Sequence, residues 1–283
     1  LSDRNVKYLT CNIVNNKFPN HVFFSNHIFQ LNETFQELFD PTNKIQKEIL
    51  ATKKRLKKYL FLNHHLRTER FKIFESLYLN NNLESGLVSF NWDLNKLNSN
   101  PLEYQVTETD IKYIENSTAY KLIPLELDGN IQTEYSSTFI NKKQIQNPVF
   151  FSPPNTNVTH YYNVYFEIIT EGFSSSTPFH NYVDRSNCIH FSEKIWKPIF
   201  FNIPFCFWGP EGSLSELKKY FDFKFDCPLY YCNDGYNINE FCDKVNELAS
   251  LPYNELHQMY YDYYDDFEWN QRILKEYCKQ TIL

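Results

Sequence analysis

Along this chain, apolar runs of strand length alternate with segments whose apolar positions recur every three or four residues. KYLFLN (58–63) and GLVSFNW (86–92) are runs of the first kind, and RFKIFESLYLNN (70–81) between them has the helical repeat. Near-continuous apolar runs are typical of strands that are buried on both faces of a parallel sheet. The pattern therefore predicts a β-α-β unit over residues 58–92.

The same alternation resumes at Tyr161 and continues along the rest of the chain. It predicts an α/β fold, in which a Rossmann-type, doubly wound parallel sheet is flanked by helices and binds ligands at the carboxyl ends of its strands. Ser213 and Glu216 are expected to form a capping box. In chain order the predicted elements are a strand at 161–170, a helix from 191, a strand at 204–209, a helix at 213–221, a strand at 228–232, a helix at 238–251 and one or two helices in 252–280.

The amino-terminal part has a different pattern. VKYLTCNIV (6–14) and HVFFS (21–25) are rich in β-branched and aromatic residues, which predicts two strands. IQKEILATKKRLKKY (45–59) has apolar residues at helical spacing and a cluster of Lys and Arg residues at 53–58 on the opposite face. This cluster either binds a polyanion or forms the solvated face of a connecting helix, and we favour the second interpretation.

Glycine is scarce and limits how the protein can bind phosphate. The chain has 6 glycines in 283 residues, whereas average usage of about 7% would give roughly 20. They are scattered, so the clustered glycines of dinucleotide-binding and phosphate-binding loops are missing. Any phosphate must therefore be bound by side chains and helix N-termini.

Charge and hydropathy exclude further classes of function. The 28 Lys and Arg residues against 34 Asp and Glu residues give a formal net charge of −6, which counts against nucleic acid as a partner. Mean hydropathy is −0.53, and no apolar run approaches the roughly 18 residues of a membrane span. The 7 cysteines include no C-x-x-C pair, which favours reduced thiols in the cytoplasm.

Metal chemistry has weak support. His160, His180 and His190 follow one another at intervals of twenty and ten residues, and no single helix or turn would bring them together. Asp265 and Asp266 resemble a metal-binding D-x-D only superficially, because they lie in a predicted helix. We therefore expect neither a metal site nor a cofactor.

The first segment with candidate chemistry is the stretch from Asn63 to Arg70, directly after a predicted strand. Arg67 and Arg70 lie at the start of the following helix, where the helix N-terminus already favours anions. Guanidinium groups suit pyrophosphate because they bind it in bidentate geometry. The alternative is that both arginines pair with Glu69 and Glu75 on the surface.

The second segment is S-E-K-I-W-K-P, which begins the helix predicted from 191. Ser192 is a good N-cap, and Glu193 and Lys194 then lie in the first turn beside free backbone N–H groups. Lys194 is unfavourable for the helix dipole at this position, so a bound anion would explain it. The alternative is an ordinary capped helix, kinked at Pro198.

Four motifs follow one another along residues 57–250. They are N-x-x-x-R-x-x-R after the first strand, a Glu-bearing strand end at 166–171, S-E-K-I-W-K-P at 192–198 and P-F-C-F-W-G at 204–209. This arrangement resembles the nucleotide-sugar-binding half of GT-B glycosyltransferases, and in particular the α-1,3-fucosyltransferases with their F-E-N, T-E-K and P-[IV]-x-x-G stretches. It also resembles viral and phage glycosyltransferase-like proteins that have an E-K-T-[FW]-K-P motif.

The resemblance implies roles for the charged residues of these motifs. In such enzymes the arginine of the first loop and the lysine of the T-E-K turn bind the donor pyrophosphate, and the glutamate contacts the ribose or the sugar. By this resemblance Arg70 or Arg67 binds the pyrophosphate together with Lys194, and Glu193 contacts the ribose or sugar.

Other residues are assigned to the donor side or to catalysis with alternatives left open. The counterpart of the F-E-N glutamate is Glu167 or Glu171. An inverting reaction needs a carboxylate or histidine as base within reach of the acceptor hydroxyl. The candidates are His64, Glu171 and Asp93, in the order of their expected exposure to the predicted cleft. The remaining donor-side candidates within the motifs are Ser192, Lys197, Trp208 and Gly209.

The GT-B fold has two Rossmann-like halves, and the resemblance accounts for one of them. We expect 1–56 to be a partial acceptor-side segment with a connecting helix. We expect 57–283 to be the nucleotide-sugar-binding domain, with an insertion at about 93–150 and C-terminal helices. The acceptor half is then either reduced and supplemented by these additions, or it lies upstream of Leu1.

The resemblance implies a metal-independent glycosyltransferase that transfers a sugar from a GDP- or UDP-type donor to a glycan, a protein or another hydroxyl acceptor. A viral origin would place it in the host cytoplasm or the virion. The alternative is a non-catalytic interaction or structural module that keeps the nucleotide-sugar-binding fold. The short acceptor side favours this alternative.

Overall fold

The computed structural model describes the central and carboxyl-terminal parts of the chain most fully. The described residues are 8–10, 12–14, 21–23, 51–63, 67–90, 107–123, 125, 158–171, 188–191, 193–209, 212–232 and 237–281. Three predicted site residues, His64, Asp93 and Ser192, lie outside them.

A five-stranded sheet forms the centre of the protein. Its strands are β4 (Tyr59–Asn63), β5 (Gly86–Phe90), β6 (Phe166–Thr170), β8 (Phe205–Trp208) and β9 (Tyr231–Cys232). All neighbouring strands are parallel, and the spatial order is β5-β4-β6-β8-β9. This confirms the predicted α/β class with a parallel sheet flanked by helices, an arrangement compatible with a Rossmann-like fold.

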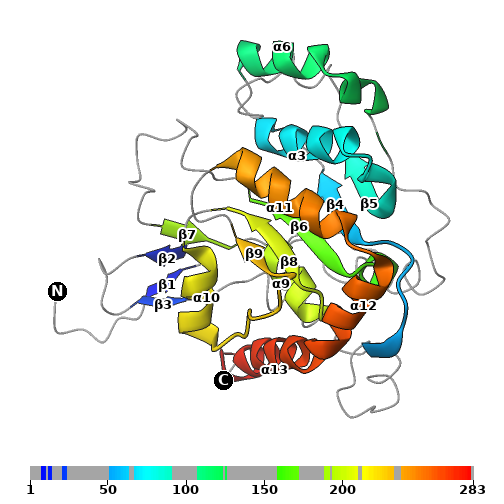
Figure 1. Ribbon diagram of the computed structural model, residues 1–283. Helices are drawn as coiled ribbons and strands as arrows, with labels where there is room; N and C mark the ends of the chain where they lie inside the picture. Colours follow the sequence, from blue (N-terminus) through cyan, green and yellow to red (C-terminus); the bar gives the residue numbers. More distant parts are fainter. Residues whose placement is uncertain are drawn as a thin grey trace, which may run out of the picture.

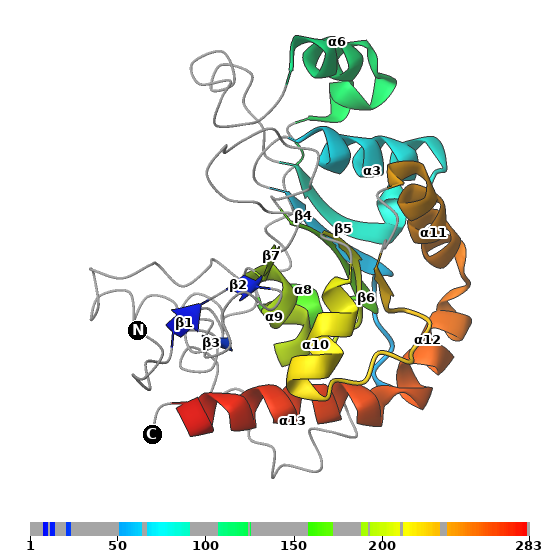
Figure 2. The same cartoon turned by 90° about the vertical axis from the view of Figure 1, so that its left-hand side faces the viewer.

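Helices cover both faces of the sheet (Figures 1 and 2). One face carries α3 (Thr68–Leu79) and α11 (Ile238–Ser250), which lie side by side. The other carries α9 (Glu193–Phe200), α10 (Ser213–Phe221) and α13 (Tyr264–Thr281), and α12 (Tyr253–Asp262) leads from α11 to α13. Within the described parts of the chain, no helix has both the length and the apolar character needed to cross a membrane.

Smaller elements complete the structure beside the sheet and its covering helices. β1 (Tyr8–Thr10) pairs in parallel with β3 (His21–Phe23), and β2 (Asn12–Val14) pairs antiparallel with β7 (Cys188–His190). Strands thus occur in both predicted stretches, but the single strand predicted at 6–14 is two strands that pair with different partners. The remaining elements are η1 (Leu83–Ser85), α6 (Glu108–Asn116), η2 (Thr118–Leu122) and α8 (Val158–Tyr162).

Two local predictions within the sheet domain are wrong. The strand predicted from Tyr161 begins only at Phe166, because Tyr161 and Tyr162 belong to α8. The capping box also does not form: the N-cap of α10 is Gly212, whose φ of 76° is left-handed, and it makes no side-chain cap bond. Ser213 is then the first helical residue and is fully buried, so its hydroxyl is not in the N-cap position.

The basic cluster at 53–58 is not the solvated face of a helix, because residues after Thr52 leave the helical conformation. Arg55 is buried, and its guanidinium lies over the Tyr260 ring at 3.6 Å from the ring centroid. Its backbone N–H donates to the Tyr165 hydroxyl at 3.1 Å. A cation–π contact of this kind joins the segment before β4 to the carboxyl-terminal helices.

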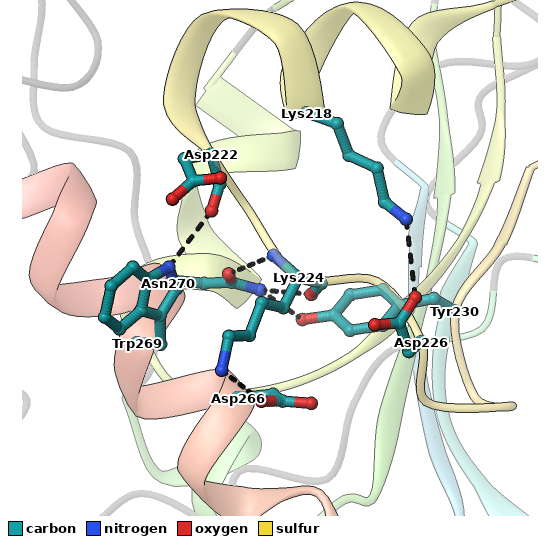
Figure 3. Close-up of polar contacts among 8 residues, drawn as sticks. All are labelled: Lys218, Asp222, Lys224, Asp226, Tyr230, Asp266, Trp269 and Asn270. Atoms are coloured by element: carbon teal, nitrogen blue, oxygen red, sulfur yellow. Dashed lines mark hydrogen bonds and ion pairs between the residues drawn. The ribbon is translucent and has the colours of Figure 1, made fainter.

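The carboxyl-terminal helix α13 is attached to the chain between α10 and β9 by the polar contacts drawn in Figure 3. Asn270, fully buried, accepts from the Lys224 backbone N–H and donates to the Lys224 carbonyl, both at 2.7 Å. Trp269 donates to the Asp222 carbonyl at 3.0 Å, and Asp266 forms an ion pair with Lys224 at 2.9 Å. Asp266 therefore has a structural partner on the surface of the domain.

Candidate functional site

The strand order creates a topological switch point between β4 and β6. From β4 the chain moves to β5 on one side, and the later strands follow on the other side. β4 pairs with β6 only at their amino ends, where Tyr59 is opposite Phe166 and Leu60 is opposite Glu167. In open α/β sheets, ligands bind outside the carboxyl ends of the strands at such a point.

Arg70 reaches this point from α3. Its Nε donates to Thr170 Oγ1 at 2.8 Å, and its Nη2 donates to the Thr170 carbonyl at 3.4 Å. Both residues are buried, with exposed fractions of 5% and 4%. The buried guanidinium is therefore held at the carboxyl end of β6, and Arg70 does not have the surface position of the alternative interpretation.

Lys194 reaches the same carbonyl from the opposite face of the sheet. It lies in the first turn of α9, and its Nζ donates to the Thr170 oxygen at 3.2 Å. The same ammonium group is 3.9 Å from Glu171 Oε2. The Lys194 side chain is 33% exposed and that of Glu171 only 3%, so solvent reaches the lysine side chain far more than the carboxylate.

Arg67 adds a third cation. It is the N-cap residue of α3, with an extended backbone. Burial lowers the pKa of its guanidinium, against the opposing effects of the Glu69 and Glu171 carboxylates. We call Arg67, Arg70, Thr170, Glu171 and Lys194 the switch-point cluster. It combines three cations with one carboxylate beside the first turns of two helices, where helix dipoles favour anions.

Asn63, which sequence reasoning did not select, ends β4 at the same edge of the sheet. Its side chain is buried, with the residue 2% exposed, and neither its amide nitrogen nor its amide oxygen has a hydrogen-bond partner. Such groups are rare in folded proteins and call for an explanation. The available signal in the sequence was a polar residue that ends an apolar strand and begins the N-x-x-x-R-x-x-R motif.

The two alternative glutamates occupy opposite ends of β6. Glu171 follows the strand and lies in the switch-point cluster. Glu167 is near the amino end, three residues from Thr170, or about 10 Å along an extended strand. It lies near Lys197, and the Tyr161 hydroxyl donates to its Oε1 at 3.4 Å. Of the two candidates, Glu171 is the one with a carboxylate oxygen 3.9 Å from Lys194, whereas Glu167 interacts first with Lys197 and less with Lys194.

Ionisation of Glu167 should make the stability of the folded protein depend on pH. Burial raises its pKa from 4.5 to about 8, although Lys197 and Tyr161 act in the opposite direction. Between these two values the folded state keeps a proton that the unfolded state has lost. The free energy of unfolding should therefore fall as pH rises from about 4.5 to about 8, by at most about 1.4 kcal/mol per pH unit.

Glu167→Gln should flatten this part of the stability profile, because glutamine preserves the shape of the neutral acid and does not ionise. The measurement is chemical denaturation at several pH values within this range. Glu247→Gln, at an exposed ion pair with Lys244, should leave the slope as in the wild type. A Glu167→Gln variant with the wild-type slope would show that Glu167 is ionised in the folded protein at neutral pH.

Two further candidates, Trp208 and Gly209, lie at the carboxyl end of the neighbouring strand β8. Trp208 is opposite Thr170 in the β6–β8 register, but its indole packs against the Phe241 ring at 5.5 Å in the core. Gly209 follows it, and an added Cβ would lie 2.3 Å from the Phe207 ring. The structure thus gives both positions packing roles. Glu193 begins α9, but its side chain lies outside the described part of the structure.

A separate pocket of about 460 Å³ lies between α3, α6 and α11. Its charged lining consists of Lys72, Glu75 and Asp243, so carboxylates outnumber cations there. In the switch-point cluster, by contrast, cations outnumber carboxylates, so this cluster is the better site for an anionic ligand.

The described residues contain no group of three or more His, Cys, Asp or Glu side chains arranged to hold a metal ion. The positive charge of the switch-point cluster comes from the side chains of Arg67, Arg70 and Lys194. No protein-family model, curated protein or solved structure matches this chain significantly.

Proposed function

We propose that this protein is a glycosyltransferase that binds a nucleotide-diphosphate sugar at the switch-point cluster. One observation carries the proposal: Arg70 and Lys194 are 124 positions apart and lie on opposite faces of the sheet, yet both donate to the Thr170 carbonyl. This brings cations from two of the sequence motifs to one strand end.

A diphosphate fits the chemistry of this cluster. Two guanidinium groups and one ammonium group offer many N–H donors, and guanidinium can bind phosphate oxygens in bidentate geometry. The N-terminal turns of α3 and α9 add partial positive charge at the same place. During sugar transfer, negative charge grows on the departing nucleoside diphosphate, and fixed cations would stabilise it.

Glu171 fits a position beside the donor. Its carboxylate is next to Lys194, where it can orient the ammonium group and accept a hydrogen bond from a hydroxyl of the donor. The proposed donor is a GDP- or UDP-sugar, and the proposed acceptor is a hydroxyl group of a glycan or protein. The likeness of the sequence motifs to the GT-B nucleotide-sugar-binding half supports this assignment.

Thermal unfolding with a panel of nucleotides tests the proposal. At a ligand concentration of about 100 times Kd, binding adds about 2.7 kcal/mol of stability, which corresponds to a rise in Tm of roughly 5–10 °C. We expect such a rise with GDP, UDP or their sugar conjugates, and a smaller one with the nucleosides. No rise with any nucleotide in the panel would refute the proposal.

A second measurement distinguishes transfer from binding alone. The protein is incubated with the stabilising nucleotide sugar, and the release of nucleoside diphosphate is followed with and without glycan acceptors. A transferase releases nucleoside diphosphate, and acceptor speeds the release. Stabilisation without any release would instead identify the non-catalytic binding module.

A further inference from the structure

The unpartnered amide of Asn63 lies on the face of the sheet that carries α3. Side chains alternate along a strand, so Asn63 shares a face with Tyr59 and Phe61. In the parallel register it is opposite Phe90, whose ring lies 6.4 Å from that of Phe71 in α3. The Asn63 side chain therefore enters the layer between the strand ends and the first turns of α3.

Arg70 enters the same layer. It belongs to the first turn of α3 and donates to the hydroxyl of Thr170, which ends β6 as Asn63 ends β4. Asn63 and Thr170 thus close the two strands on either side of the switch point, and the guanidinium of Arg70 already binds one of them. Among the described residues, the amide of Asn63 is a buried polar group at this edge for which the structure shows no hydrogen-bond partner.

We propose that Asn63 is a donor-binding residue, whose amide recognises sugar-ring hydroxyls adjacent to the diphosphate. An amide both donates and accepts hydrogen bonds, and a pair of neighbouring hydroxyls offers the matching acceptor and donor. In a nucleotide sugar, hydroxyl-bearing rings flank the diphosphate on both sides, as ribose and as the transferred sugar. This inference rests on the proposed function, since the diphosphate at the cations is what brings a ring to Asn63.

The energetic signature of such a role is specific. A buried amide without a partner destabilises the ligand-free protein, and a ligand that bonds to it removes the penalty. Replacing Asn63 by leucine, which has a similar shape and no polar atoms, should therefore stabilise the ligand-free protein while it weakens binding. If a buried water instead bonds to the amide, Asn63→Leu should destabilise the ligand-free protein and leave nucleotide binding unchanged.

The test compares Asn63→Leu with the wild type, with and without nucleotide. We expect the ligand-free variant to unfold at the wild-type Tm or up to about 4 °C above it, and to bind the nucleotide sugar about tenfold more weakly. Asn63→Ala serves as a second variant, and it should show the same loss of affinity. Asn82→Leu is the matched control: Asn82 is also buried but donates to Asn246 and Ser250, so its loss should lower Tm and leave affinity unchanged.

Ligand variants identify which ring Asn63 contacts. If it contacts ribose, 2′-deoxy or 3′-deoxy nucleoside diphosphates should bind the wild type more weakly, and Asn63→Leu should not discriminate against them. If it contacts the transferred sugar, the variant should lose the extra affinity of the nucleotide sugar over the nucleoside diphosphate. Wild-type affinity in both Asn63 variants would overturn this inference and leave the proposed function intact, whereas a wild type that binds no nucleotide would refute the proposed function itself.

Discussion

Replacing Lys194 by alanine is expected to weaken the binding of a nucleoside diphosphate roughly 10- to 100-fold, because one charge-assisted hydrogen bond contributes about 1.5–3 kcal/mol. Lys194 donates to the Thr170 carbonyl and lies beside Glu171. Its loss leaves two arginines against one carboxylate in the switch-point cluster, and the phosphate meets a less positive site. Calorimetric titration, or the ligand-induced shift in Tm, measures the change.

The control is Lys218→Ala. Lys218 also forms an ion pair with a carboxylate, at 3.4 Å from Asp226, but both side chains are exposed. An exposed pair contributes little, so this variant should bind ligand as the wild type does. Lys194→Arg keeps the charge and should keep part of the affinity. An alanine variant at 194 with wild-type affinity would show that the ligand does not contact this lysine.

The resemblance implied that Arg70 or Arg67 acts together with Lys194, and the fold provides a simple physical reason for their proximity. Arg70 lies in the first turn of the helix after one predicted strand, and Lys194 lies in the first turn of the helix before another. In a doubly wound parallel sheet, both positions are at the edge formed by the carboxyl ends of the strands. Strand length, apolar runs and helical periodicity are local signals that placed each residue beside a predicted strand, whereas the expectation that both act at one site came from the resemblance. Contact with the same carbonyl oxygen, from opposite faces, depends on the strand order and came only from the structure.

Other features depend on contacts far apart in the chain. The motif resemblance left Glu167 and Glu171 as alternatives, because both lie in the Glu-bearing strand end at 166–171, and only the structure shows that Glu171 contacts Lys194. Arg55 has a helical, basic sequence context, yet the Tyr260 ring 205 positions away holds it in the core. Ser213 matches a capping motif, but a left-handed Gly212 moves the helix start by one residue.

The S-E-K-I-W-K-P motif combines two physical roles within one helix. Lys194 points to the switch-point cluster, whereas Trp196 is fully buried, with its ring 5.6 Å from both Phe191 and Phe221. Trp196 thus joins α9 to α10 below the carboxyl edge of the sheet. A lysine for ligand and a tryptophan for packing can lie two positions apart because successive residues on a helix face in different directions.

Trp196→Ala should therefore lower the free energy of unfolding by about 3–5 kcal/mol, the usual cost of removing a fully buried aromatic side chain. Chemical denaturation measures this directly. Trp269→Ala is the matched control, because Trp269 is only partly buried and makes one hydrogen bond to the Asp222 carbonyl, so its loss should cost clearly less. Well below its lowered Tm, Trp196→Ala should still bind nucleotide within a few-fold of the wild type, since Lys194 is retained. Equal stability of the two tryptophan variants would show that the contacts of the Trp196 ring do not stabilise the packing of α9 more than Trp269 stabilises that of α13.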